Sequence, residues 1–184
     1  MLTVKELRAL AGRLTGTYFC RQIGPFALVQ KPPKPVVEQM ALRLGAQRTV
    51  LGNGMGSLEA FQVSMLLSFD TLQVATLPPL RTLDSLGVGR LPNCDLVLND
   101  PSVSKVHAEL RWHGPASTCC VKDLQSTNGT FLNEQPLTPG QEYVVRDGDL
   151  LRFGDADFAF FLAKSLHARL LRGGVVSEAP EVGQ

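Results

Sequence analysis

The sequence predicts a mainly β fold, in which a β-sandwich is preceded by a small α/β module at the N-terminus. Between about residue 72 and residue 162, short apolar runs alternate with turns rich in Gly, Asn, Asp and Pro, a pattern typical of sandwiches. Before residue 68, two stretches carry apolar side chains at helical spacing instead. The length of 184 residues leaves room for one domain with an extension or for two small domains.

Residues 1–68 are expected to form the α/β module. Thr3 and Glu6 have the spacing of a capping box, which predicts that a helix starts there, and Gly16 is expected to end it. No chemical motif stands out in this module, so its function stays open. Further strands are predicted at 24–29, 48–51 and 61–69 (where a helix is also compatible), a helix at 36–44, and a proline-rich connector at 31–35.

Residues 69–164 are expected to form the sandwich, and 165–184 a short helix followed by a disordered tail. Ser165 would cap that helix, which would end at Leu171. Strands are predicted at 72–77, 84–90, 95–98, 106–112, 118–124, 130–132, 143–145, 150–153 and 158–162.

Composition and charge exclude several classes of protein. A chain with 44% hydrophobic residues and a formal net charge of +1 is neither wholly disordered nor held to nucleic acid by its overall charge. Its apolar stretches are shorter than the ~18 residues of a membrane-spanning helix, and its first residues lack the pattern of a signal peptide. We therefore expect a cytoplasmic protein that binds neither nucleic acid nor membrane.

The cysteines and histidines show no metal or redox pattern. None of the four cysteines has C-x-x-C spacing, so without secretion we expect reduced thiols. Cys119 and Cys120, if they lie on a strand, point to opposite faces. The three histidines are scattered, and we expect no metal cluster between them and the cysteines. The glycine-rich segment 52–57 lacks a G-K-[ST] ending and is expected to be a turn, not a phosphate loop.

Three short motifs lie in order within the predicted sandwich. They read Gly89-Arg90, Ser104-x-x-His107 and Asn128-Gly129, and an Asp-Gly-Asp turn follows at 147–149. Together, in register, they resemble the forkhead-associated (FHA) domain, over about residues 70–164. The resemblance implies a β-sandwich whose loops at one end bind phosphothreonine peptides.

The residues at the motif positions suit a phosphorylated ligand. A phosphothreonine carries about −1.5 to −2 charges and three strong acceptor oxygens. Arg90 would supply a fixed cation with a fork of N–H donors, and Lys105 a second, mobile charge. Ser104 and Thr127 would add hydroxyls, and Asn128 would clamp the peptide backbone beside the phosphothreonine. The resemblance implies structural roles for three further residues that support this site, Gly89, His107 and Gly129.

The sequence departs from the family pattern in two places. Many members have Arg after the serine, where this chain has Lys105, a point charge without the planar fork. Many also have Asn-Gly at the hairpin after the N-G strand, where this chain has Asn133-Glu134. Because Glu resists positive φ, we expect a different type of turn there. Neither change touches Arg90, Ser104 or Asn128.

The resulting prediction is a non-catalytic, phosphothreonine-dependent interaction module in Ser/Thr kinase signalling. Its partner would be a phosphothreonine-containing protein, such as a Ser/Thr kinase or its substrate, and no cofactor is expected. The alternative is an assembly scaffold that binds partners independently of phosphorylation. A hydrolase built on Ser104 and His107 lacks a G-x-S-x-G elbow. Base stacking on Trp112 is weak support for a nucleic-acid binder.

Overall fold

The computed structural model describes residues 2–31, 67, 70–76 and 84–172. The helix predicted at 36–44, the strand at 48–51 and the tail from residue 173 lie outside these residues, as does nearly all of 61–69. Within the described residues, no helix is long and apolar enough to cross a membrane. All four cysteines are free in the structure.

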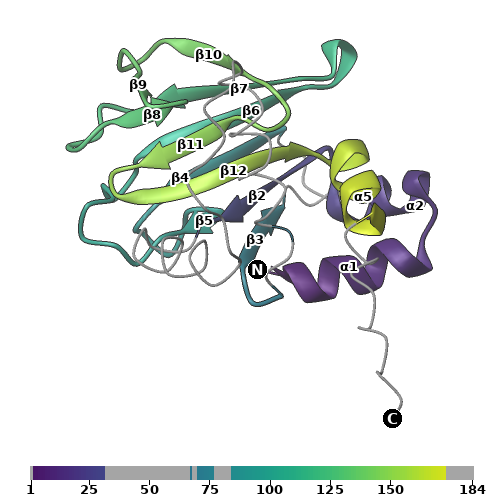
Figure 1. The fold of residues 1–184 in the computed structure, drawn as a ribbon. Helices are drawn as coiled ribbons and strands as arrows, with labels where there is room; N and C mark the ends of the chain where they lie inside the picture. Colours follow the sequence, from purple (N-terminus) through teal and green to yellow (C-terminus); the bar gives the residue numbers. More distant parts are fainter. Residues whose placement is uncertain (1, 32–66, 68–69, 77–83, 173–184) are drawn as a thin grey trace, which may run out of the picture.

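The described strands form two sheets that face each other (Figure 1). All strand pairs are antiparallel except β4 with β5. The seven-stranded sheet has the order β1 (Leu2–Thr3), β3 (Gln73–Thr76), β2 (Phe26–Gln30), β12 (Ala156–Leu162), β11 (Leu150–Phe153), β8 (Thr130–Leu132) and β9 (Gln135–Pro136). The five-stranded sheet has the order β10 (Glu142–Val145), β7 (Thr118–Asp123), β6 (Ala108–His113), β4 (Ser85–Gly89) and β5 (Leu96–Val97), and a 3₁₀ turn at Gly114–Ala116 joins β6 to β7.

Strand β2 belongs to the sandwich although it comes from the N-terminal part of the chain. It pairs with β12 along Phe26–Gln30 and with β3 on its other side. A strand that is buried on both faces has a continuous apolar run in its sequence. Strand β2 is of this kind, since four of its five residues are buried. The described part of 1–68 therefore shares a sheet with 69–164, and a separate role for residues 1–68 stays a prediction.

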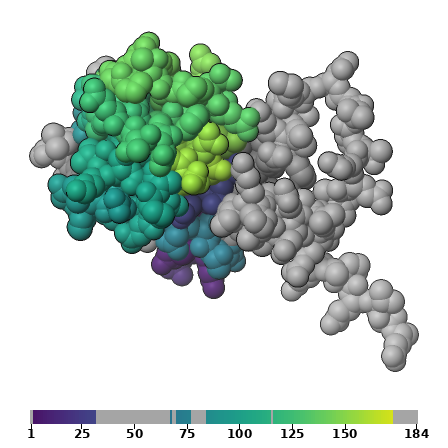
Figure 2. Space-filling view, turned by 90° about the vertical axis from the view of Figure 1, so that its left-hand side faces the viewer, coloured from purple at the N-terminus to yellow at the C-terminus, as the bar shows by residue number. Residues whose placement is uncertain are grey.

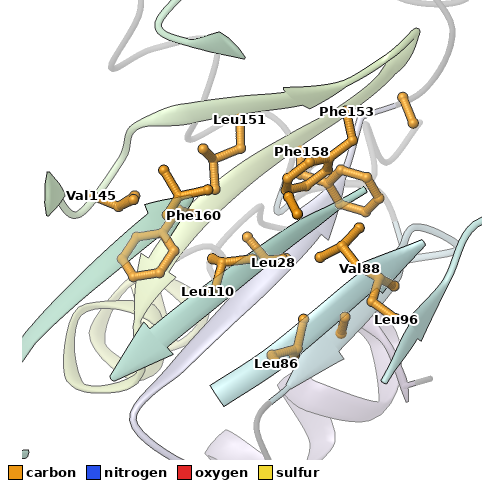
Figure 3. Close-up of a cluster of buried hydrophobic side chains, with 14 of the residues drawn as sticks. Leu28, Leu86, Val88, Leu96, Leu110, Val145, Leu151, Phe153, Phe158 and Phe160 are labelled. Carbon is orange, nitrogen blue, oxygen red and sulfur yellow. The ribbon is translucent and has the colours of Figure 1, made fainter. Parts of the chain in front are cut away.

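The main core lies between the two sheets (Figure 3). Phe153, Phe158 and Phe160 project from the seven-stranded sheet towards Val88 and Leu110 of the other sheet, and all are at most 1% exposed. Buried residues alternate with more accessible ones along β7 and through the first half of β6, as expected of strands with one face on the core. Cys119 points into this core and Cys120 to the outer face, as predicted.

Three helices gather at one side of the sandwich, away from the β11–β12 hairpin (Figure 1). They are α1 (Val4–Arg13), α2 (Gly16–Ile23) and α5 (Ala163–Arg172). Their apolar faces form a second core against the outer face of β2 and β12, which includes Phe19 and Phe161. In the space-filling view the teal and green sandwich residues make up most of the coloured surface, and purple N-terminal residues lie below them (Figure 2).

The helices confirm one sequence prediction and correct two. Thr3 and Glu6 form the capping box, with the Thr3 N–H donating to Glu6 Oε2 at 2.7 Å. Gly16 does not close a single helix; it begins α2, which the sequence analysis missed. Ser165 lies inside α5 and is not its cap, because its hydroxyl donates to Asp147 Oδ2 at 2.7 Å. That bond fastens α5 to the turn before β11.

Two loops also differ from prediction. Strand β6 begins at Ala108, so Ser104–His107 form a turn ahead of the strand and not its first residues. The hairpin between β8 and β9 has positive φ at both Asn133 (49°) and Glu134 (68°), as a type I′ turn requires. Hydrogen bonds of the Asn133 side chain offset the strain at Glu134. Asn133 Nδ2 donates to Asp149 Oδ1 at 2.9 Å, and Asn133 Oδ1 accepts the Leu150 N–H at 2.8 Å.

Candidate phosphopeptide-binding cleft

The structure brings the five predicted binding residues together around one open cleft of about 400 Å³. They reach it from three separate loops: Arg90 from the one after β4, Ser104 and Lys105 from the one before β6, and Thr127 and Asn128 from the one after β7. Pro101, Ser102, Val103 and Val106 complete the lining. These loops lie at the end of the sandwich opposite the helices, so a rigid scaffold presents them to solvent.

Arg90 is held through its main chain, which leaves its side chain exposed. Its N–H donates to the carbonyl oxygens of Ser104 (3.0 Å) and Lys105 (3.1 Å), which ties the two loops together. Gly89 makes this close approach possible, because a Cβ there would lie 2.4 Å from the Lys105 carbonyl oxygen. The structural role that the family resemblance implied for Gly89 thus has a steric cause.

His107 braces the Ser104 turn from beneath. It is fully buried, its Nδ1 accepts the Ser104 N–H at 3.0 Å, and its Nε2 lies 3.1 Å from the Gly129 carbonyl oxygen. These bonds assign the proton to Nε2. Both ring nitrogens are therefore engaged by main-chain groups, so His107 cannot act as a base towards the Ser104 hydroxyl. That hydroxyl instead accepts the Thr127 N–H at 2.9 Å.

The Asn128 side chain joins two loops within the cleft. Its Nδ2 donates to the Ser102 carbonyl oxygen at 2.8 Å, while the Ser102 hydroxyl accepts the Asp155 N–H at 2.8 Å. Ser102 was not among the predicted site residues, although the Asp100-x-Ser102 spacing is a signal for the turn that it makes. Asp100 accepts both the N–H and the hydroxyl of Ser102, at 2.8 and 2.6 Å.

A buried carboxylate, also missed in the sequence, shapes the loop after β7. Asp123 is 1% exposed. It accepts the Ser126 N–H at 3.0 Å, the Ser126 hydroxyl at 2.6 Å and the Thr130 hydroxyl at 2.6 Å. Gly129 has φ of 80° and turns the chain back into β8. The positions of Thr127 and Asn128 therefore depend on the hydrogen bonds that Asp123 accepts from Ser126 and Thr130.

The cleft carries uncompensated positive charge. Arg90 and Lys105 are both exposed, and neither has a carboxylate oxygen within 4.0 Å among the residues that the structure describes. Side-chain hydroxyls of Ser104 and Thr127 and the amide of Asn128 stand beside them. Two cations with neutral donors around a cleft form a site for a dianionic group, since charge-assisted hydrogen bonds are the stronger ones.

Acidification is expected to destabilise this end of the protein. Burial lowers the pKa of His107 below its usual 6.5. Burial acts to raise the pKa of Asp123, but hydrogen bonds from Ser126 and Thr130 outweigh it and hold that pKa below 3.8. Below pH 6.5 the His107 ring therefore binds a proton in the unfolded chain more readily than in the folded protein, which destabilises the folded state. Asp123 destabilises the folded state in the same way below pH 3.8.

The free energy of unfolding should accordingly fall as pH drops from about 7.5 to about 5.5, by at most about 1.4 kcal/mol per pH unit for one proton. Urea unfolding at the two pH values measures the change, and NMR titration of the His107 ring shows whether that residue causes it. A His107 ring that protonates above pH 6.5 would contradict the assignment.

The fold and the site define a class: a two-sheet β-sandwich with a loop-borne cleft for an anionic group. Residues 86–154 match the family model of the FHA domain. The protein FraH of Nostoc sp. (strain PCC 7120) is 41% identical over 66 residues, 36% of this chain and 22% of FraH. FhaA of Mycobacterium tuberculosis is 39% identical over 70 residues, which are 38% of this chain and 12% of FhaA.

Solved structures are also similar to this chain. A crystal structure of the FhaA FHA domain, in complex with an intracellular domain of another protein, is 33% identical, covers 48% of this chain and 87% of its own, and has a TM-score of 0.41. The N-terminal FHA domain of S. cerevisiae Rad53p, solved with a phosphothreonine peptide, is 24% identical with coverage of 48% and 76% and a TM-score of 0.41. This chain contains an FHA domain, at residues 86–154. The matched segments span only 22% and 12% of FraH and FhaA.

Proposed function

We propose that this protein is a non-catalytic module of Ser/Thr kinase signalling in the cytoplasm. Its partner is a phosphothreonine-containing protein, such as a Ser/Thr kinase or its substrate. The observation that carries the proposal is the cleft in which Arg90 and Lys105 are exposed without carboxylate partners among the described residues, beside Ser104, Thr127 and Asn128. A neutral peptide would leave those two cations without a counter-charge, whereas a phosphate accepts from both.

The first test is calorimetry with one peptide in two forms, carrying either phosphothreonine or threonine at the same position. We expect at least about 100-fold tighter binding of the phosphorylated form, because hydrogen bonds to charged groups contribute about 1.5–3 kcal/mol each. The peptides are chosen from a phosphothreonine library screened against the full chain. Equal affinities for the two forms of every selected peptide would end the proposal.

The scaffold alternative needs a test other than deletion of residues 1–68. That deletion would remove β2 from between β3 and β12 and with it Phe26 and Leu28, both fully buried in the main core. Loss of partner capture in the deletion variant would therefore report unfolding. Treating captured partners with phosphatase, with the full chain unchanged, separates the two functions: a scaffold keeps its partners and a phosphothreonine reader releases them.

A further inference from the structure

We propose that His113, Cys120 and Glu142 form a Zn²⁺ site on the outer face of the five-stranded sheet. Their ligand atoms, a ring nitrogen, a thiol sulfur and a carboxylate oxygen, all lie within 4.8 Å of one another. From the sequence no metal cluster was expected between the histidines and the cysteines, but the fold brings His113 and Cys120 close together. The site shares no residue with the phosphopeptide cleft and would not depend on its function.

Strand register places Cys120 between the other two residues of the site. Cys120 on β7 lies opposite Arg111 of β6 and Val144 of β10. His113 and Glu142 are each two residues from those positions and so are diagonal neighbours of Cys120 on the same face. Diagonal neighbours on adjacent antiparallel strands are within reach of long side chains. The residues of β6, β7 and β10 that alternate with them include Leu110, Cys119, Val121 and Val145, which pack into the core.

The set of donors suits zinc more than other common metals. Zinc binds thiolate sulfur at about 2.3 Å, imidazole nitrogen at about 2.0–2.1 Å and carboxylate oxygen at about 2.0–2.2 Å. In a tetrahedron these bond lengths separate the ligand atoms by roughly 3.4–3.6 Å. Side-chain rotations that move the ligand atoms by about one ångström would therefore complete the site. Magnesium and calcium prefer oxygen ligands alone. Glu142 is exposed, which leaves the fourth position open to water.

Charge balance at the site is favourable once a metal binds. The Cys120 thiol gives up its proton to solvent and binds as thiolate, so the thiolate and the Glu142 carboxylate neutralise the two charges of Zn²⁺. Arg111 competes in the metal-free protein, since its Nη1 lies 3.4 Å from Glu142 Oε1. Its Nη2 holds Glu109 Oε2 at the shorter distance of 3.1 Å. Arg111 therefore keeps a carboxylate partner when Glu142 turns to the metal.

The test is titration of the reduced, metal-free full chain with Zn²⁺ in competition with a chromophoric chelator. We expect one high-affinity ion per chain. Co²⁺ in place of Zn²⁺ should give the visible bands of a tetrahedral ion together with a sulfur-to-cobalt charge-transfer band. C120S should remove the charge-transfer band and weaken Zn²⁺ binding more than about 100-fold, beyond the 10–100-fold that loss of an outer-shell partner costs. E142Q should also weaken binding.

Two matched variants make the result specific. C20S removes another partly exposed thiol, on α2, and should bind Zn²⁺ as the unaltered chain does. R111Q removes the competitor for Glu142 and should bind Zn²⁺ more tightly. Circular dichroism of each variant checks that the fold is retained. An unaltered chain that binds no better than C120S, or C20S weakened as much as C120S, would overturn the site. R111Q with unchanged or weaker binding would overturn the role of Glu142.

Discussion

Replacing Arg90 with Ala is expected to reduce phosphothreonine-peptide affinity by at least about 100-fold. The exposed guanidinium is one of the two cations that line the cleft. If it donates two charge-assisted hydrogen bonds to the phosphate, their loss at about 1.5–3 kcal/mol each corresponds to more than two orders of magnitude in affinity. The fold should not change, because the bonds from Arg90 to the Ser104 and Lys105 carbonyls come from its main chain. Calorimetry with the matched peptide pair measures the loss, and urea unfolding should differ by less than about 0.5 kcal/mol.

Two other substitutions test whether the loss of affinity in R90A comes from the Arg90 guanidinium in the cleft. R90K keeps the charge but loses the planar fork, so its affinity should fall between those of the unaltered protein and R90A. R13A removes an exposed arginine at the end of α1, away from the cleft, and should bind normally. If R90A binds the phosphopeptide as tightly as R13A does, the cleft is not the phosphate site.

Replacing Gly89 with Ala is expected to damage both the cleft and the stability of the domain. The added Cβ would lie 2.4 Å from the Lys105 carbonyl oxygen and 2.8 Å from Cys94 Sγ. The first contact is with main chain, so β4 must move away from the loop that carries Ser104 and Lys105. Overpacking of this kind typically costs about 1–3 kcal/mol. Phosphopeptide affinity should fall at least about tenfold as Arg90 separates from Ser104.

A glycine two residues earlier on the same strand provides the control. A Cβ at Gly87 would meet its nearest atom, Asp95 Oδ2, at 3.5 Å, an ordinary contact. G87A adds the same methyl group on the same strand and the same side of the sheet. It should therefore keep its phosphopeptide affinity and lose less than about 1 kcal/mol of unfolding free energy. Both variants are compared by urea unfolding and by calorimetry. Equal behaviour of G89A and G87A would refute the steric explanation.

Much of the fold could be predicted because its signals are local. Alternating burial marks β6 and β7, and Thr3 with Glu6 caps α1, since side-chain periodicity and capping depend on residues a few positions apart. The type I′ hairpin at Asn133-Glu134 was mispredicted for a related reason. Intrinsic preference disfavours positive φ at Glu134, but bonds from Asn133 to Asp149 and Leu150 impose it from a distant strand.

The sequence alone was enough to select Arg90, Ser104 and Asn128 on the cleft loops, because their motifs are short and follow one another in a recognisable order. Only the tertiary structure decided which residues support those loops and which other side chains come together elsewhere on the sheets. It placed β2 inside the sheet, joined Asn128 to Ser102, and brought His113 to Cys120. These contacts depend on how strands distant in sequence pair and in which register, and no local pattern of residues encodes that pairing.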